Sequence, residues 1–126
     1  MTKSKSYMFN KQDEKAIHLF TELGMPRNLA KTLMYISQVE ECRSAEIERG
    51  ADLRQPEVSV AMQELQKKGW IKRRDIKKKG KGRPVHIYKL TASLDNILKT
   101  FEQEKVEQIN SVKKDISDLK NLIEGR

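Results

Sequence analysis

The chain has 126 residues, of which 26 are Lys or Arg and 18 are Asp or Glu, so its formal net charge is +8. Apolar residues make up only 37% of it, which argues against a large two-layer enzyme core and favours one small domain with an appended solvated helix. Its single cysteine, Cys42, excludes an internal disulfide and a cysteine-based zinc cluster. We find neither an apolar run long enough to cross a membrane nor an apolar leader segment, and we expect a cytoplasmic protein.

Four short helices are expected in the first half of the chain, after a flexible segment of residues 1–10. The first starts near Lys11, capped by Asn10 or Asp13, and ends at Gly24. The second has Pro26 at its first position and ends near Gln38. The apolar side chains expected to be buried by these two helices are Ala16, Ile17, Phe20, Leu23, Leu29, Ala30, Leu33, Met34 and Ile36.

The third and fourth helices form a recognisable pair. The third is expected over residues 45–49, between Ser44 as its N-cap and Gly50 as its end. The fourth is expected from Gln55 to about Lys68. Two helices joined by a turn of a few residues that contains Gly predict a helix-turn-helix.

A basic β-hairpin is predicted directly after the fourth helix. Residues 70–76 and 85–90 are β-prone, and the lysine- and glycine-rich segment 77–82 lies between them as a turn. Residues 67–89 hold eleven Lys or Arg residues against one acidic residue, Asp75, so this segment carries a net charge of +10 and the rest of the chain is slightly acidic. Such a concentration of charge is typical of proteins that bind a polyanion.

One long helix is predicted from Thr91 or Ser93 to Ile123, because this segment contains no Gly or Pro. A helix of this length would span about 45 Å, which a small domain cannot cover, so we expect a second copy of the chain to pack along it. The first part of this helix has an apolar face that includes Ile97. Charged residues interrupt the apolar pattern between Glu102 and Lys105, where a kink or a change of packing partner would fit. A coiled-coil stripe follows. The residues expected to form the dimer interface are Leu94, Leu98, Phe101, Ile109, Val112, Ile116, Leu119 and Ile123.

The solvent-facing side of the fourth helix is the candidate base-reading surface. Gln can bond adenine through two hydrogen bonds, Ser can bond several base edges, and an exposed Val can touch a thymine methyl group. The residues expected to read bases are Gln55, Pro56, Ser59, Val60 and Gln63. The residues expected to contact phosphates, most of them in the hairpin, are Arg54, Lys67, Arg73, Lys77, Lys78, Lys79, Lys81 and Arg83. The alternatives are an ordinary solvated helix face and a lysine run that only aids solubility.

Residues 53–90 resemble the helix-turn-helix and wing of winged-helix transcription regulators of the MarR, TrmB and ArsR-like groups. The segments that carry the resemblance are Gln55-Pro56-Glu57-Val58-Ser59, Leu65-Gln66-Lys67-Lys68-Gly69-Trp70-Ile71, Gly82-Arg83-Pro84 and Tyr88-Lys89-Leu90-Thr91. The resemblance implies a DNA-binding homodimer whose recognition helix enters the major groove with the wing tip beside it. It places Ser59, Val60 and Gln63 at base-reading positions and Arg83 in the wing, and it likens the last helix to a dimerisation helix. The chain leaves no room for the sugar-binding domain of TrmB-type regulators.

The sequence thus predicts a mainly α fold with a small β-hairpin, a winged helix-turn-helix with a long C-terminal dimerisation helix. The expected segments are a flexible N-terminus at 1–10, a DNA-binding domain at 11–91, a coiled-coil-like dimerisation helix at 92–123 and a tail at 124–126. The expected function is a sequence-specific, homodimeric regulator of transcription that binds double-stranded DNA in the nucleoid. It is not expected to be an enzyme, to hold a cofactor or metal, or to bind a membrane, and a small-molecule effector stays open.

We also weigh other functions. A winged helix can serve as a protein-docking or architectural chromatin module without sequence specificity. RNA binding is disfavoured, because the strands offer no exposed aromatic side chains for stacking. Cys42 could act as a redox sensor if its thiol were exposed and its pKa lowered.

Overall fold

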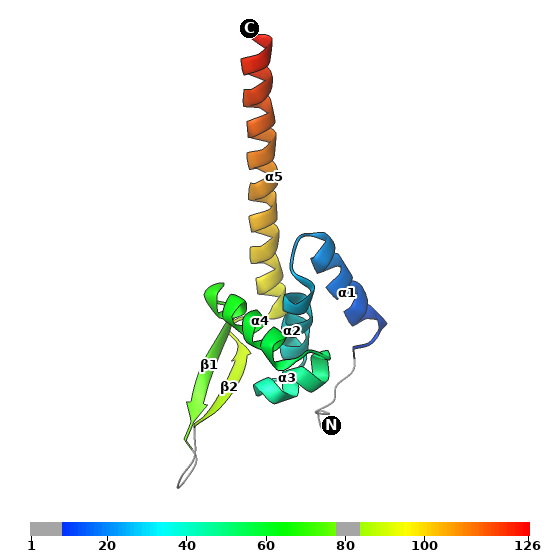
Figure 1. Ribbon diagram of the computed structural model, residues 1–126, viewed down its shortest axis with the longest axis vertical. Helices are drawn as coiled ribbons and strands as arrows, with labels where there is room; N and C mark the ends of the chain where they lie inside the picture. The colour runs from blue at the N-terminus through cyan, green and yellow to red at the C-terminus, as the bar shows by residue number, and fades with distance from the viewer. Residues whose placement is uncertain (1–8, 78–83) are drawn as a thin grey trace. The chain divides into compact units, whose positions relative to one another are not determined.

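The computed structural model describes residues 9–77 and 84–126, and within them it contains five helices and a two-stranded antiparallel hairpin (Figure 1). The chain divides after Ser93 into two compact units. This architecture confirms the expected mainly α fold with a hairpin and a long C-terminal helix. The elements in order are α1 (Lys11–Glu22), α2 (Arg27–Gln38), α3 (Ser44–Ala51), α4 (Gln55–Lys67), β1 (Ile71–Ile76), β2 (Val85–Leu90) and α5 (Leu94–Glu124).

Helix α2 is the centre of the first unit, where it packs against α1, α3, α4 and β2. Its predicted apolar face is buried throughout, and Ala30, Leu33 and Ile36 have no exposed surface. The prediction for α1 is only partly right, because Leu23 is 52% exposed. Leu23 is the C-cap residue of α1, so it lies beyond the last turn that faces α2.

The ends of α1 and α2 follow from local hydrogen bonds. Asn10 Oδ1 accepts from the backbone N–H of Asp13 at 2.8 Å, and Asp13 Oδ2 accepts from the backbone N–H of Asn10 at 3.1 Å, which is a capping box. Asp13 Oδ1 also accepts from Gln38 Nε2 at 3.0 Å and so joins the start of α1 to the end of α2. Pro26 is the N-cap residue of α2, with ψ of 140°, and not its first helical residue as predicted.

Helix α3 differs from its prediction at both ends. It starts at Ser44 and not after it: Arg43 is the N-cap residue, and its N–H donates to Glu46 Oε1 at 2.8 Å. Gly50 lies inside the helix and does not end it; the helix ends at Ala51, and its C-cap residue Asp52 has φ of 57°. Asp tolerates this left-handed conformation better than most residues.

The predicted hairpin is confirmed, with a register that runs from Ile71 opposite Leu90 to Ile76 opposite Val85. Strand β2 also forms a bridge with the loop before α3. The N–H of Cys42 donates to the carbonyl oxygen of Tyr88 at 3.0 Å, and the N–H of Tyr88 donates to the carbonyl oxygen of Cys42 at 2.8 Å. The hairpin that carries the basic residues is therefore tied to the helical core. The predicted tip residues Lys78, Lys79, Lys81 and Arg83 lie outside the described residues.

Helix α5 has 31 residues and is about 47 Å long. It runs without a break through residues 102–105, where charge interrupts the apolar stripe. Ile97 and Phe101 are buried, whereas every residue from Val106 onward is exposed. None of the helices in the described segments is long and apolar enough to cross a membrane.

Candidate nucleic-acid interface

Helix α4 separates a buried side from an exposed side. Val58, Ala61, Met62 and Leu65 are at most 4% exposed and hold the helix against the core. The helix begins where the N–H of Arg54 donates to Glu57 Oε1 at 2.8 Å. All five predicted base-reading residues lie on the exposed side, namely Gln55, Pro56, Ser59, Val60 and Gln63.

The exposed side of α4 has two unlike flanks. On one flank, Pro56, Val60 and Ala61 meet Pro26 and Leu29 of the α2 region in an apolar groove of about 380 Å³, and Glu57 and Glu64 line the same groove. At 100° per residue, Gln55, Ser59 and Gln66 fall on the other flank. Because carboxylates repel phosphates, the uncharged flank is the one that DNA can approach most closely.

The acidic flank was missed by the sequence reasoning, which treated the outer face of α4 as uncharged near its start. The helical positions of Glu57 and Glu64 could have revealed it, because both lie within about 100° of the centre of that face. The groove itself depends on the packing of α2 against α4 and has no local sequence signal.

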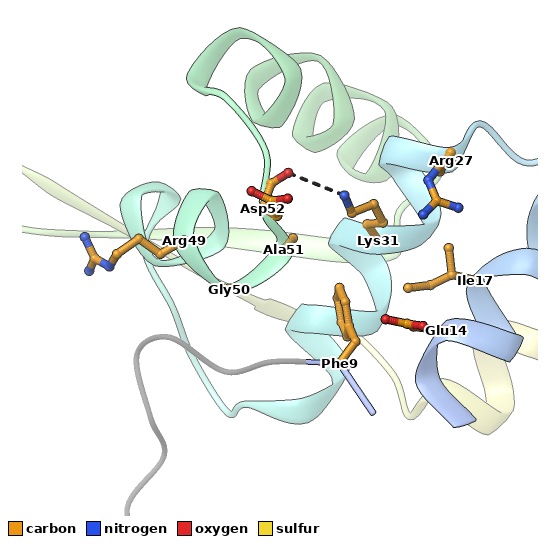
Figure 2. Close-up of a pocket in the computed structure, with 9 residues that line it drawn as sticks. All are labelled: Phe9, Glu14, Ile17, Arg27, Lys31, Arg49, Gly50, Ala51 and Asp52. Atoms are coloured by element: carbon orange, nitrogen blue, oxygen red, sulfur yellow. Dashed lines mark hydrogen bonds between the residues drawn. The ribbon is translucent and has the colours of Figure 1, made fainter. Parts of the chain in front are cut away.

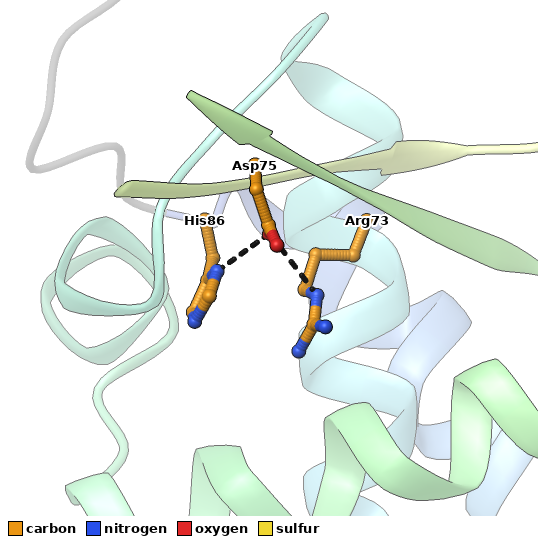
Figure 3. A network of polar contacts seen from close by, with 3 residues as sticks. All are labelled: Arg73, Asp75 and His86. Atoms are coloured by element: carbon orange, nitrogen blue, oxygen red, sulfur yellow. Dashed lines mark hydrogen bonds and ion pairs between the residues drawn. The ribbon is translucent and has the colours of Figure 1, made fainter. Parts of the chain in front are cut away.

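One face of the hairpin carries a three-residue polar network (Figure 3). Asp75 Oδ1 lies 3.3 Å from Arg73 Nε and 2.7 Å from His86 Nδ1, and all three side chains are about half exposed. The strand register explains the network. Arg73 and Asp75 are two residues apart in β1, so their side chains lie on the same face, and His86 of β2 is directly opposite Asp75. Arg73, a predicted phosphate contact, is therefore paired with the single acid of the basic segment.

The other face of the hairpin gathers Lys72, Arg74 and Lys89. Arg74 Nη2 donates to both carboxylate oxygens of Glu41, at 2.9 and 2.8 Å. Lys72 and Lys89 stand directly opposite each other across the two strands. Like charges in this position destabilise a strand pair, so the arrangement has a cost that a bound polyanion would remove. Sequence reasoning missed the Glu41 contact because the two residues are far apart in the chain.

The remaining predicted phosphate contacts have simpler surroundings. Arg54, Lys67 and Lys77 are exposed. The neighbouring Lys68 makes a cation–π contact, because its ammonium lies 5.1 Å from the ring centre of the buried Trp70. Arg54 and Lys67 lie at the two ends of α4, so the exposed face of this helix has a cation at each end.

Cys42 is not placed as a redox sensor. Its side chain is 2% exposed. Burial, with a smaller contribution from the negative charge of Glu46, raises the pKa of the Cys42 thiol to about 12. The thiol therefore stays protonated at neutral pH, and the thiolate is the form that reacts with oxidants.

A second cavity, of about 650 Å³, opens between α1, α2 and α3 (Figure 2). Its lining includes the cations Arg27, Lys31 and Arg49, with Glu14 and Asp52 as counter-charges. Figure 2 shows the three cationic ends pointing in different directions, and Lys31 Nζ donates to the backbone carbonyl of Asp52 at 3.4 Å. The cations do not converge, so the cavity presents no assembled anion site.

Comparison with known proteins supports the fold that this geometry indicates. Residues 23–82 match the model of the MarR family. The chain contains a winged helix-turn-helix of the MarR type. In this MarR-type domain α4 takes the place of the recognition helix and β1–β2 that of the wing. The matched family model and the similar structures are those of transcriptional regulators.

Solved structures share this MarR-type fold at low sequence identity. A possible transcriptional regulator from Methanosarcina mazei Go1 is 15% identical with a TM-score of 0.59, over 81% of this chain and 87% of that one. The archaeal chromatin protein TrmBL2 is 16% identical with a TM-score of 0.55, over 90% of this chain but only 43% of its own. A MarR-family transcription regulator is 16% identical with a TM-score of 0.53, over 82% of this chain and 66% of its own. No curated protein sequence matches the chain.

Proposed function

We propose that the protein is a sequence-specific regulator of transcription that binds double-stranded DNA as a homodimer. The observation that carries the proposal is the exposed, largely uncharged flank of α4, a helix that contacts β1 of the basic hairpin. A protein that only attracts polyanions needs charge but no such face. A protein that reads bases needs both, because phosphate contacts position it and base contacts specify the sequence.

In this proposal α4 enters the major groove. Ser59 and Gln63 offer hydrogen-bonding groups to base edges, and Gln55 lies at the start of the helix. Val60 and Pro56 border the acidic groove, so their apolar contacts would lie at the edge of the reading face. Arg54 and Lys67 contact phosphates at the two ends of the helix. The hairpin, with Lys72, Lys77 and Lys89, follows the backbone or the adjacent minor groove.

The proposed division of labour follows the chain. Residues 11–91 form the DNA-binding domain, and residues 92–123 form the dimerisation helix. A dimer presents two copies of α4 to half-sites about one helical turn apart, roughly 34–36 Å, so the operator should be a pseudo-palindrome. Such a protein would work in the cytoplasm, on the nucleoid.

Selection of bound sequences from random duplex DNA with the purified protein tests this function. We expect enrichment of an inverted repeat. Gln63→Ala should relax the preference at one position of each half-site, by about 1–3 kcal/mol per lost base contact. Gln103→Ala removes the same side chain from an exposed position on α5 and should leave the selected sequence unchanged. Discrimination that survives Gln63→Ala would mean that this residue is not part of the reading face.

A salt titration tests the wing separately. Replacing Lys77, Lys78 and Lys79 by Ala should weaken binding to all sequences alike and flatten the dependence of affinity on salt, by roughly one unit of slope per lost phosphate contact. The matched control replaces three exposed lysines away from the wing, Lys11, Lys99 and Lys114. An unchanged slope in the wing variant would contradict the assignment.

An architectural chromatin role is the second candidate. It is favoured by the likeness to the archaeal chromatin protein TrmBL2, which extends over 90% of this chain. The random-sequence selection distinguishes the two functions, since tight binding to duplex DNA without enrichment of any sequence would support the architectural role.

A further inference from the structure

The second half of α5 carries an apolar stripe with no covering residues in the described part of the chain. Ile109, Val112, Ile116, Leu119 and Ile123 are each 50–57% exposed. We propose that two copies of α5 pair along this stripe as a parallel, in-register coiled coil. The proposal rests on the homodimer proposed above and specifies its geometry.

The residue types along the stripe favour two strands. The spacings of three and four residues place Ile109, Ile116 and Ile123 at a positions of a heptad, and Val112 and Leu119 at d positions. β-Branched residues at a with Leu at d favour parallel dimers over higher oligomers. In this helix all three a positions are Ile, and one of the two d positions is Leu.

The coil is bounded on its N-terminal side by charge. The preceding a and d positions hold Glu102 and Lys105, which in a parallel pair would meet their own copies. Lys105 is instead engaged within its own helix, where its ammonium donates to Gln108 Oε1 at 3.2 Å and lies 5.3 Å from the ring centre of Phe101. The pairing therefore begins after Lys105, and Phe101, which the sequence placed in the dimer interface, is already buried in the protomer.

The charges beside the stripe select the orientation. Lys113 and Lys120 occupy e positions, and Asp115 occupies a g position. In a parallel coil a g residue faces the e residue of the next heptad on the partner, so Asp115 meets the partner's Lys120 on both sides of the dimer. In an antiparallel coil e faces e, so lysine would face lysine. Charges at e and g are known to set orientation in this way.

These flanking residues are available for a partner. Within the described part of the protomer, the ion pair on this half of α5 joins Lys114 to Asp118 at 3.0 Å, on the side away from the stripe, and Asp115 and Lys120 form none. A second copy supplies both with a partner. The parallel arrangement also brings the two α5 N-termini together, so both MarR-type domains emerge at one end of the coil.

Disulfide cross-linking of the full-length protein tests the orientation. Ile109→Cys and Ile123→Cys are made separately, oxidised under native conditions, and blocked with a thiol reagent before denaturing electrophoresis. The wild-type protein is the control, since its buried Cys42 should not cross-link. A disulfide needs Cα atoms within about 7 Å, so in a parallel, in-register coil each variant should cross-link to itself.

Each other outcome overturns the proposal in a distinguishable way. In an antiparallel coil centred on Ile116, residues 109 of the two chains lie about 21 Å apart, so only a mixture of the two variants would cross-link. Cross-linking at one position alone would indicate an antiparallel coil centred on that position. Either result would reject the parallel geometry but leave the homodimer intact. A wild-type protein that sediments as a monomer would reject the homodimer itself.

A charge exchange gives an independent measurement. Asp115→Lys should weaken the dimer, because it places two lysines together on each side of the parallel coil. The double variant Asp115→Lys/Lys120→Asp should restore the dimer dissociation constant to near the wild-type value. If the changes in dimerisation free energy caused by the two substitutions are additive, the two side chains do not face each other, and the proposal is overturned.

Discussion

The residue type at position 50 is constrained by a side chain that is distant in the sequence. Gly50 lies inside α3, where glycine is normally unfavourable by about 1 kcal/mol relative to alanine. A Cβ at this position would overlap ring carbons of Tyr35 on α2. Tyr35 is 2% exposed, so its ring is enclosed by the protein and not free to turn out into solvent. The glycine therefore allows the close approach of α3 to α2.

Gly50→Ala should accordingly destabilise the protein. Helix propensity alone would stabilise the variant by up to about 1 kcal/mol, whereas an overpacked core typically costs 1–3 kcal/mol, so we expect a net loss of about 1–2 kcal/mol. Urea denaturation followed by circular dichroism measures it. Arg49→Ala, at an exposed position of the same helix, should stay within about 0.5 kcal/mol of the wild type. A Gly50→Ala variant as stable as the wild type would show that the Tyr35 contact is not limiting.

Residues whose role is local were predictable from the sequence, and residues whose role is a tertiary contact were not. Asn10 at the start of α1 and Gly24 just after its end act through hydrogen bonds or backbone angles within a few residues; Asn10 is one of the two predicted caps, and Gly24 is the predicted end. Gly50 was assigned to a helix end because a glycine there usually has that role, and Tyr35 gave no local sign of its contact. Glu41, which binds Arg74 of the hairpin, was missed for the same reason.

At the scale of elements, the hairpin is a cationic ribbon with one internal counter-charge. Asp75 binds both Arg73 and His86 on one face. Because these side chains are about half exposed, the pairs contribute little to stability, typically 0–1 kcal/mol. Their larger effect is on the electrostatic field of the wing, where Asp75 partly neutralises Arg73, which could otherwise contact phosphate.

Asp75→Asn should therefore raise the affinity for duplex DNA, by a similar factor for all sequences, and steepen the salt dependence by up to about one unit of slope. Fluorescence anisotropy at several salt concentrations measures both quantities. Asp118→Asn makes the same chemical change in an ion pair of α5 and should leave DNA binding unchanged. Unchanged or weaker binding by Asp75→Asn would mean that the polar network orients Arg73 for DNA rather than occupying it.

The elements themselves were well predicted, because periodicity and helix-ending residues determine them. All five helices and both strands begin and end within about two residues of their predicted bounds. In α3, predicted over 45–49 and found over 44–51, the short sequence has too few turns for the apolar pattern to fix its ends. The base-reading and phosphate-binding roles stay predictions, since they depend on a partner.

At the scale of the whole molecule, the question is what covers the apolar stripe of α5. Each of its five main residues is about half exposed, which is unusual for a contiguous row of Ile, Val and Leu in a monomer. Two heptads of this kind could hold two copies together without any change in the fold of the MarR-type domain. The dimer would then let two weak DNA contacts act as one strong contact.

Ile116→Asp should convert the protein to a monomer that remains folded, because the residue is exposed in the protomer and lies at the centre of the stripe. An aspartate there would meet its own copy across the interface, where an unpaired buried charge is strongly unfavourable. Sedimentation velocity measures the change in mass, and affinity for the selected inverted repeat should fall by about 10²–10⁴-fold as bivalent binding is lost. Ser111→Asp, which adds the same charge on the outward face of α5, should remain dimeric. An Ile116→Asp variant that stays dimeric would place the interface elsewhere on the molecule.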